Sequence, residues 1–208
     1  LCSAGWSFLM IAIVDYGLGN VQAFANIYQR LGVPNKIVSN PSELESAAGF
    51  ILPGVGSFDW AITMLNKSGL RDCLHHLVCE EKRPFLGVCV GMQLLCKRSQ
   101  EGNLDGLGWL DGEITKLDSC KTHEKFLLPH MGWNTISDFK NEGLFNRLDK
   151  PEFYFLHSYC FLPQGATEAL ATANYGGLFV SAVKYGNIFG VQFHPEKSDK
   201  TGLKMIEN

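Results

Sequence analysis

A single cysteine in this sequence lies between two glycines, directly after an apolar run. The stretch is Gly87-Val88-Cys89-Val90-Gly91, preceded by Pro84-Phe85-Leu86. It has the form G-x-nucleophile-x-G, in which a strand ends at a sharp turn and a helix follows. Such a turn exposes the Cys89 sulfur at a helix N-terminus that favours the thiolate, and places the Val90 N–H near a developing oxyanion. A buried structural cysteine in a tight turn would produce the same residues, so the pattern alone leaves both roles open.

A cysteine nucleophile requires a base, and one of the six histidines has a suitable setting. His194 ends the apolar run Ile188–Phe193 and is followed by Pro195 and Glu196. Because proline bars a helix there, we expect extended chain, in which residues two apart point to the same side. Glu196 would then fix the His194 tautomer and support its imidazolium. A strand-end histidine beside a surface glutamate is the plainer interpretation of the same residues.

A loop with two glycines follows another apolar run. In Leu52-Pro53-Gly54-Val55-Gly56, the glycines allow backbone N–H groups to face a substrate oxygen. An ordinary turn between a strand and a helix has the same composition. The loop therefore gains meaning only in combination with the other two motifs.

The first half of the chain alternates between short apolar runs and helical patterns, with Gly and Pro at the junctions. This alternation predicts an α/β fold with an open, mostly parallel sheet and helices on both faces. The expected strands are Met10–Asp15, Lys36–Val38, Gly49–Leu52 and Pro84–Val88. The expected helices are Val21–Leu31, one starting at Asn40, Phe58–Asn66, Leu70–Glu81 and Val90–Arg98.

The second half is rich in strand candidates, which we expect to extend the sheet with antiparallel strands. Turns at Tyr175-Gly176-Gly177 and Tyr185-Gly186-Asn187 are typical of hairpins. A last helix is expected from about Ser198. We expect one domain over residues 10–208, with Met10 as the natural start and residues 1–9 as an upstream extension or expression remnant. The strand candidates are Gly112–Leu117, Phe126–Leu128, Asn134–Ser137, Glu152–Leu156, Glu168–Ala173, Phe179–Tyr185 and Ile188–Phe193.

Composition excludes several classes of protein. The 208 residues are 46% hydrophobic and 19% charged with a net charge of −3, which is ordinary for a globular protein and gives no basic surface for nucleic acid. The apolar run Trp6–Val14 is too short to span a membrane and lacks the flanks of a secretory signal. Seven cysteines without a C-x-x-C pair indicate neither zinc nor a disulfide framework, and favour a reduced, cytoplasmic protein. Gly17-Leu18-Gly19 lacks the third glycine of a dinucleotide fingerprint, and no cofactor is implied.

The three motifs, in this order along the chain, resemble the class I glutamine amidotransferases. The resemblance implies that Cys89 attacks the side-chain amide carbon of glutamine. It implies that His194 takes the thiol proton and delivers a proton to the departing ammonia, and that Glu196 orients His194. The oxyanion would be held by N–H groups of Gly54, Val55, Gly56 and Val90. The family likeness also assigns glutamine contacts to Gly56, Gln93, Glu101, Ser158 and Tyr159.

Further motifs resemble the branch of this family that serves histidine biosynthesis. They are Asp15-Tyr16-Gly17-Leu18-Gly19-Asn20, the stretch from Leu128 to Asn134, Phe155-Leu156-His157-Ser158-Tyr159 and Gln192–Ser198. That likeness implies a heterodimer with a (β/α)₈-barrel cyclase, which uses the ammonia to make imidazole glycerol phosphate and aminoimidazole carboxamide ribotide. It places Asn20, Met131, Trp133, Tyr154 and Lys197 near the partner interface and the ammonia exit.

Three other functions share some of these features. A paralogous glutaminase would keep the chemistry and feed a different amidation partner. A cysteine peptidase or γ-glutamyl hydrolase on a related scaffold would act on glutamyl peptides instead of free glutamine. A non-catalytic docking subunit would only stabilise a barrel partner, which the intact Cys89, His194 and Glu196 argue against.

Overall fold

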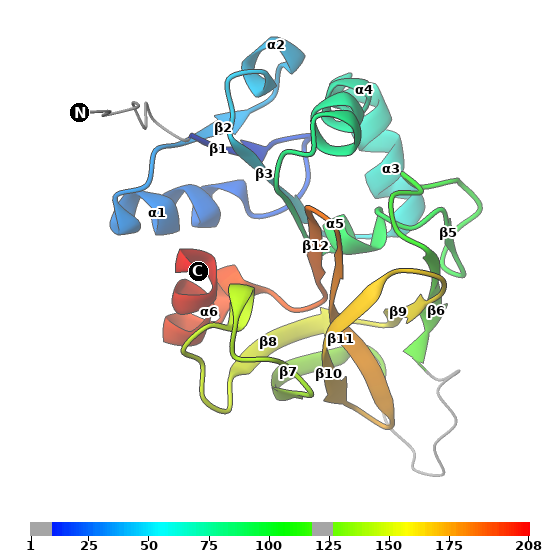
Figure 1. Ribbon diagram of the computed structural model, residues 1–208. Helices are drawn as coiled ribbons and strands as arrows, with labels where there is room; N and C mark the ends of the chain where they lie inside the picture. The colour runs from blue at the N-terminus through cyan, green and yellow to red at the C-terminus, as the bar shows by residue number, and fades with distance from the viewer. Residues whose placement is uncertain (1–9, 118–126) are drawn as a thin grey trace.

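The computed structural model describes residues 10–117 and 127–208 (Figure 1). The expected extension 1–9 lies outside the described residues, and so does Phe126, the first residue of the expected strand Phe126–Leu128. Leu127 and Leu128 are described and lie outside any strand, so that prediction is wrong for them. Residues 128 and 129 instead form a bend that leads into the next strand.

The centre of the fold is a parallel sheet of five strands in the order β2-β1-β3-β4-β12. These strands are β1 (Ile11–Val14), β2 (Asn35–Val38), β3 (Gly49–Gly54), β4 (Phe85–Cys89) and β12 (Ile188–Val191). Every residue of β3 is buried, as expected for a strand covered on both faces. All five strands run in the same direction, so their carboxyl ends share one edge.

Amphipathic helices cover this parallel sheet on both faces, as predicted. α1 (Val21–Leu31) buries Phe24 and Tyr28 on one face, where the last helix α6 (Asp199–Glu207) also lies. α3 (Phe58–Lys67) and α4 (Leu70–His75) cover the other face, and the short α2 (Pro41–Leu44) packs against α4 (Figure 1). The expected helix Leu70–Glu81 is present but changes after His75 into a wider π-helical turn, His76–Glu80.

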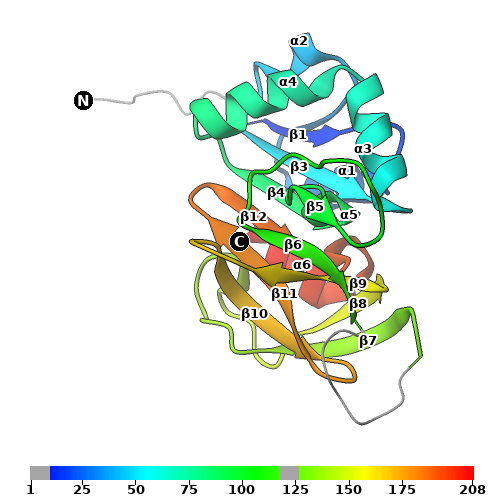
Figure 2. The same cartoon turned by 90° about the vertical axis from the view of Figure 1, so that its right-hand side faces the viewer.

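Antiparallel strands extend the sheet beyond β12, and they occupy the lower half of the molecule in Figure 2. The order continues β11-β10-β7-β8, with β11 (Leu178–Tyr185), β10 (Glu168–Asn174), β7 (His130–Ser137) and β8 (Glu152–His157). The two predicted hairpin turns join β10 to β11 and β11 to β12. β9 (Tyr159–Pro163) is a strand that the sequence patterns missed; it pairs with β11 and with β6 (Gly112–Lys116), which pairs with β5 (Arg98–Ser99).

The helix after β4 is much shorter than predicted. α5 covers only Val90–Gln93, whereas the apolar pattern indicated a helix to Arg98. The carbonyls of Leu94 and Leu95 accept hydrogen bonds from the backbone N–H groups of Leu107 and Trp109, at 2.8 and 2.7 Å. These long-range bonds replace the ones that further helical turns would have made.

The core runs without interruption through both parts of the sheet. Phe153 of β8 stacks on Phe193 at a ring-centroid distance of 3.9 Å, and Phe155 meets the same ring edge-on at 5.6 Å. All three phenylalanines are fully buried. This packing fixes the antiparallel part against the chain that follows β12. Among the described residues, no helix is both long and apolar enough to cross a membrane.

Candidate active site

Cys89 occupies a strained turn at the carboxyl edge of the parallel sheet. Its backbone angles are φ 54° and ψ −114°, a conformation that L residues rarely adopt. A Cβ atom on Gly91 would collide with the carbonyl oxygen of Leu52, and one on Gly87 would lie 2.7 Å from the carbonyl oxygen of Gly91. The two glycines therefore let α5 pack directly against β3 and β4, and this close packing holds Cys89 in its strained conformation.

The pairing of β12 with β4 places His194 at the same edge of the sheet as Cys89. β12 lies next to β4 in parallel register, with Val191 opposite Val88, so both strands end at the same edge. Cys89 is the last residue of β4, and His194 comes three residues after the end of β12. The His194 N–H donates to the carbonyl oxygen of Tyr154 at 2.8 Å, which ties the histidine to β8. Residues far apart in sequence thus meet because their strands are neighbours.

His194 and Glu196 form a buried pair. Nδ1 of His194 lies 2.9 Å from Oε1 of Glu196, and each side chain is 3% exposed. Burial disfavours the imidazolium, but the hydrogen bonds that His194 makes with Cys89 and with Glu196 outweigh it and raise the pKa of His194 to about 10. The arrangement therefore supports a protonated imidazole beside the sulfur of Cys89.

The backbone between the two residues is not extended as predicted. Pro195–Lys197 forms one turn of 3₁₀ helix, with Pro195 at its first position, where the missing N–H of proline costs nothing. The hydroxyl of Ser198 donates to the carbonyl oxygen of His194 at 2.6 Å and accepts from the Tyr154 N–H at 2.9 Å. The turn, rather than an extended chain, is what directs Glu196 back toward His194.

A cavity of about 260 Å³ opens at this edge of the sheet. The proposed nucleophile and base line it together with the five residues for which glutamine contacts are expected. Gly54 does not line it, but lies beside Cys89 in the pairing of β3 with β4. The residues lining the cavity are Val55, Gly56, Cys89, Val90, Gln93, Glu101, Pro129, Leu156, His157, Ser158, Tyr159, His194 and Lys197.

Two of the expected substrate contacts already have protein partners. Oε2 of Glu101 accepts from the backbone N–H of Phe58 at 2.9 Å, at the start of α3. Nε2 of Gln93 donates to the carbonyl oxygen of Tyr159 at 3.2 Å. Each side chain is therefore anchored: Glu101 keeps Oε1 as a further acceptor, and Gln93 keeps its single side-chain oxygen, Oε1.

His157 lines the cavity although its motif alone assigned it no role. Its Nδ1 donates to the carbonyl oxygen of Tyr159 at 2.8 Å, and its Nε2 accepts from Nδ1 of His130 at 3.0 Å. Burial lowers the pKa of His157 to about 3 and that of His130 to about 4, so both rings are neutral. The motif Leu156-His157-Ser158 was visible in the sequence, but only the tertiary structure shows that His157 is buried and lines the cavity.

Of the residues expected at a partner interface, Met131 and Trp133 lie on β7 and Tyr154 lies on β8, which pairs with β7. Met131 and Trp133 are 61% and 51% exposed, and Trp133 pairs across the sheet with Tyr154. Nζ of Lys197 lies 5.8 Å from the ring centroid of Tyr154. Asn20 has a structural task as well, because its side chain accepts the Ala23 N–H at 3.3 Å and caps α1.

Together, the strained turn at Cys89, the buried His194–Glu196 pair and the open α/β sheet are the features expected of an enzyme that uses a cysteine nucleophile. The family description of class I glutamine amidotransferases matches residues 12–208. The chain therefore belongs to the class I glutamine amidotransferase family, as the motifs predicted.

The chain is also similar to individual curated proteins over nearly its whole length. The chain is 49% identical over 200 residues to the imidazole glycerol phosphate synthase subunit HisH of Bdellovibrio bacteriovorus, covering 96% of this chain and 98% of the relative. It is 46% identical to the subunit of the same name from Leptospira interrogans, with the same coverage of both chains.

Solved structures of lower identity share the fold. A glutamine amidotransferase from Thermotoga maritima superposes with a TM-score of 0.64 at 17% identity, covering 96% of this chain and 81% of that one. PurLQS from Thermotoga maritima gives a TM-score of 0.70 at 17% identity, covering 94% of each chain. The predicted fold class is confirmed.

Proposed function

We propose that this chain is a glutaminase subunit that hydrolyses glutamine and delivers ammonia to a cyclase partner in histidine biosynthesis. The observation that carries the proposal is the convergence of Cys89 and the His194–Glu196 pair on one cavity at the carboxyl edge of the sheet. Relatives at 40–49% identity over nearly their whole length are named as subunits of imidazole glycerol phosphate synthase, which supports the pathway.

The residues of the cavity account for both halves of the reaction. The Cys89 thiolate attacks the side-chain amide carbon of glutamine, and His194, as imidazolium, gives its proton to the departing nitrogen. Ammonia leaves and a glutamyl thioester remains on Cys89. The now neutral His194 takes a proton from water, which attacks the thioester and releases glutamate. Glu196 holds the imidazole in the required tautomer throughout.

The tetrahedral intermediates carry an oxyanion, for which the Val90 N–H and the loop 54–56 are the proposed donors. Gly56 has a φ of 89°, and Val55 is 39% exposed, so the loop has conformational freedom that the strand before it lacks. We propose that this loop completes the oxyanion hole only when the partner and its acceptor nucleotide are bound. The isolated chain is then a poor glutaminase.

A partner is required by the chemistry of ammonia. In water near pH 7, most free ammonia is ammonium, which has no lone pair for attack. We propose that a (β/α)₈-barrel cyclase docks over Met131, Trp133 and Lys197 as a heterodimer and receives the ammonia directly. The proposed location is the cytoplasm, where histidine biosynthesis supplies the acceptor nucleotide.

The test is a glutamine-to-ammonia assay of the wild-type chain and of Cys89→Ala, each with and without the cyclase. We expect glutamate release that rises at least tenfold with cyclase and acceptor nucleotide, and no release from Cys89→Ala. External ammonia should still support the cyclase reaction with Cys89→Ala present. Loss of the ammonia-dependent reaction would mean that Cys89 has a structural task, and turnover with another acceptor would favour a paralogous pathway.

A further inference from the structure

We propose that Gln192 is a further residue of the glutaminase reaction, whose side-chain amide donates a hydrogen bond to the Cys89 sulfur. Gln192 lies just after β12, two residues before His194, and its side chain is fully buried. Its Nε2 lies 3.8 Å from Sγ of Cys89. This inference rests on the proposed function, because it takes Cys89 to be the nucleophile.

The orientation of the Gln192 amide is fixed by its neighbours. The carbonyl oxygen of Tyr159 can only accept, so the Gln93 atom 3.2 Å from it must be the nitrogen. That same Gln93 nitrogen lies 3.1 Å from the Gln192 amide, which must present its oxygen there. The NH₂ group of Gln192 therefore points toward Cys89, and a flipped amide would place two donors against each other.

Two of the polar neighbours of the sulfur, the Leu156 carbonyl and the Gln192 amide, match its two protonation states. Sγ of Cys89 also lies 3.8 Å from the carbonyl oxygen of Leu156, which can accept the S–H hydrogen of the thiol. The thiolate has no hydrogen to donate, and it requires donors instead. Gln192 supplies one such donor, in addition to the imidazolium of His194, so the amide stabilises the form that attacks glutamine.

The same amide links the nucleophile to the proposed glutamine contacts. Gln93 lines the cavity and is 3% exposed, and its nitrogen is shared between Tyr159 and Gln192. The backbone N–H of Gln192 donates to the carbonyl oxygen of Ser181 on β11 at 2.9 Å, which anchors the residue in the sheet. Gln192 is thus held rigidly on the side of Cys89 away from solvent.

A pH profile compared between variants isolates the effect of the Gln192 amide on Cys89, because the other titratable groups nearby stay the same. Four of them line the cavity with Cys89 and His194, namely Glu101, His157, Tyr159 and Lys197. His194 and its partner Glu196 lie on the chain that follows β12. Tyr16, which follows β1, is buried, and its pKa is raised by burial and by its proximity to Cys89. Replacement of Gln192 by an uncharged residue leaves all of these groups in place.

The experiment compares Gln192→Met, which keeps the volume but lacks a donor, with Gln192→Glu, which keeps the shape but places a carboxylate oxygen near the sulfur. The matched control is Ser181→Ala on the adjacent strand, since the Ser181 hydroxyl is buried and has no hydrogen-bond partner among the described residues. Iodoacetamide labelling of Cys89, quantified on its peptide by mass spectrometry from pH 5 to 10, reports the thiolate directly. Glutaminase kinetics with the cyclase report kcat and KM.

We expect both Gln192 variants to label Cys89 at least tenfold more slowly at pH 7, with the labelling profile moved to higher pH. The kcat for glutamine hydrolysis should fall at least tenfold while KM changes less than threefold, and Ser181→Ala should behave as wild type. Labelling and kcat within twofold of wild type in folded variants would overturn the inference, as would a change confined to KM. Failure of both variants to fold, with Ser181→Ala intact, would also count against it, by showing a purely structural role.

Failure of this inference is distinguishable from failure of the proposed function. If Cys89→Ala retains glutaminase activity, the nucleophile itself is wrong. If Cys89→Ala is inactive and the Gln192 variants are normal, only the role of Gln192 is wrong.

Discussion

At the scale of single residues, Glu196 has a hydrogen-bond partner for only one of its two carboxylate oxygens among the described residues. Oε1 accepts from His194 at 2.9 Å, whereas Oε2 is buried without a hydrogen-bond partner among the described residues. Glu196→Gln can therefore keep the accepting oxygen toward His194 and place its NH₂ at the other position, so that mainly the charge is lost. We expect kcat to fall by roughly 10²- to 10⁴-fold with little change in KM. Steady-state kinetics with the cyclase measure this, and an unchanged kcat would show that the charge is not needed.

His157 provides a prediction about stability and pH. Burial lowers its pKa from 6.5 to about 3. Between these two pH values His157 is therefore protonated in the unfolded chain but neutral in the folded chain. The free energy of unfolding should therefore fall as pH drops from about 6.5 toward 3, with up to about 1.4 kcal/mol per pH unit from this residue. His157→Gln should flatten that dependence. Urea unfolding at pH 7.5, 6 and 5 tests it, and parallel curves for both proteins would contradict it.

At the scale of elements, the contact between α5 and β3 depends on Gly91. Its added Cβ would collide with the Leu52 carbonyl oxygen, which belongs to a buried strand and has no room to move. We expect Gly91→Ala to cost more than about 3 kcal/mol or to prevent folding. Gly32→Ala is the matched control, because Gly32 also has a positive φ but a Cβ there meets no atom within 4 Å. It should cost about 1 kcal/mol in the same denaturant titration; equal costs would mean that the close approach is unimportant.

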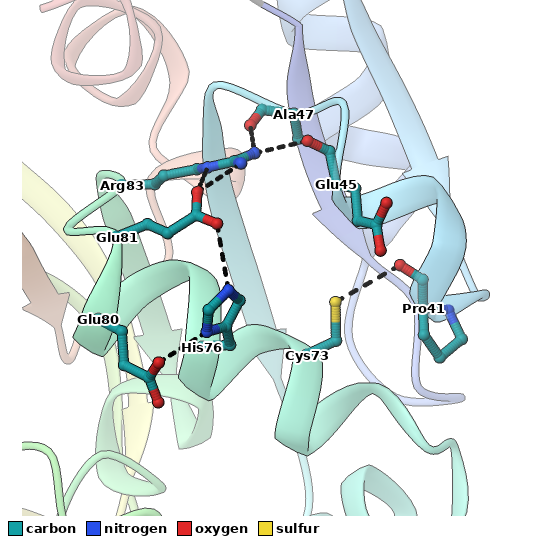
Figure 3. Close-up of polar contacts among 8 residues, drawn as sticks. All are labelled: Pro41, Glu45, Ala47, Cys73, His76, Glu80, Glu81 and Arg83. Carbon is teal, nitrogen blue, oxygen red and sulfur yellow. Dashed lines mark hydrogen bonds and ion pairs between the residues drawn. The ribbon is translucent and has the colours of Figure 1, made fainter.

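Arg83 joins two connections that lead into the parallel strands (Figure 3). Its guanidinium donates to the carbonyl oxygens of Glu45 and Ala47 at 2.7 and 2.8 Å and to the carboxylate of Glu81. Lysine cannot make all of these bonds at once, so we expect Arg83→Lys to lower stability by about 1–3 kcal/mol. Glu80→Gln breaks only the exposed pair with His76 that is drawn beside it and should leave the unfolding midpoint unchanged. A comparable loss in both variants would argue against a special role for Arg83.

At the scale of the whole molecule, the exposed side chains on β7 make a prediction about assembly. Met131 and Trp133 are more than half exposed although both are large and apolar. Replacing both by alanine should weaken binding of the cyclase at least tenfold, as measured by calorimetry, without changing the melting temperature. Tyr185→Ala is the control. Tyr185 is 48% exposed, but it pairs with Ile188 at the start of β12, whereas the site lies beyond the other end of that strand. Equal binding by all variants would show that the interface does not include Met131 and Trp133.

The sequence predicted the parallel half of the molecule well, and it named residues that the structure brings to one cavity. Strands such as Gly49–Leu52 and helices such as Val21–Leu31 have a strong local pattern, and they appear nearly where predicted. Two of the failures have a common cause, which is competition from distant backbone groups. The helix after Cys89 ends at Gln93 because the N–H groups of Leu107 and Trp109 donate to the carbonyl oxygens of the residues that follow it. β9 exists because β6 and β11 pair with it. No local pattern contains that information.

The sequence by itself determined the chemistry available to this protein: a cysteine between glycines, a histidine two residues from a glutamate, and the motifs that identify the family. These are properties of residue type and spacing, which are written along the chain. Only the tertiary structure decided which groups act on one another. The pairing of β12 with β4 brings His194 to Cys89. Hydrogen bonds with Cys89 and Glu196 favour the charged form of His194, whereas burial keeps His157 neutral, because proximity in space and exclusion of water arise only when distant segments pack together.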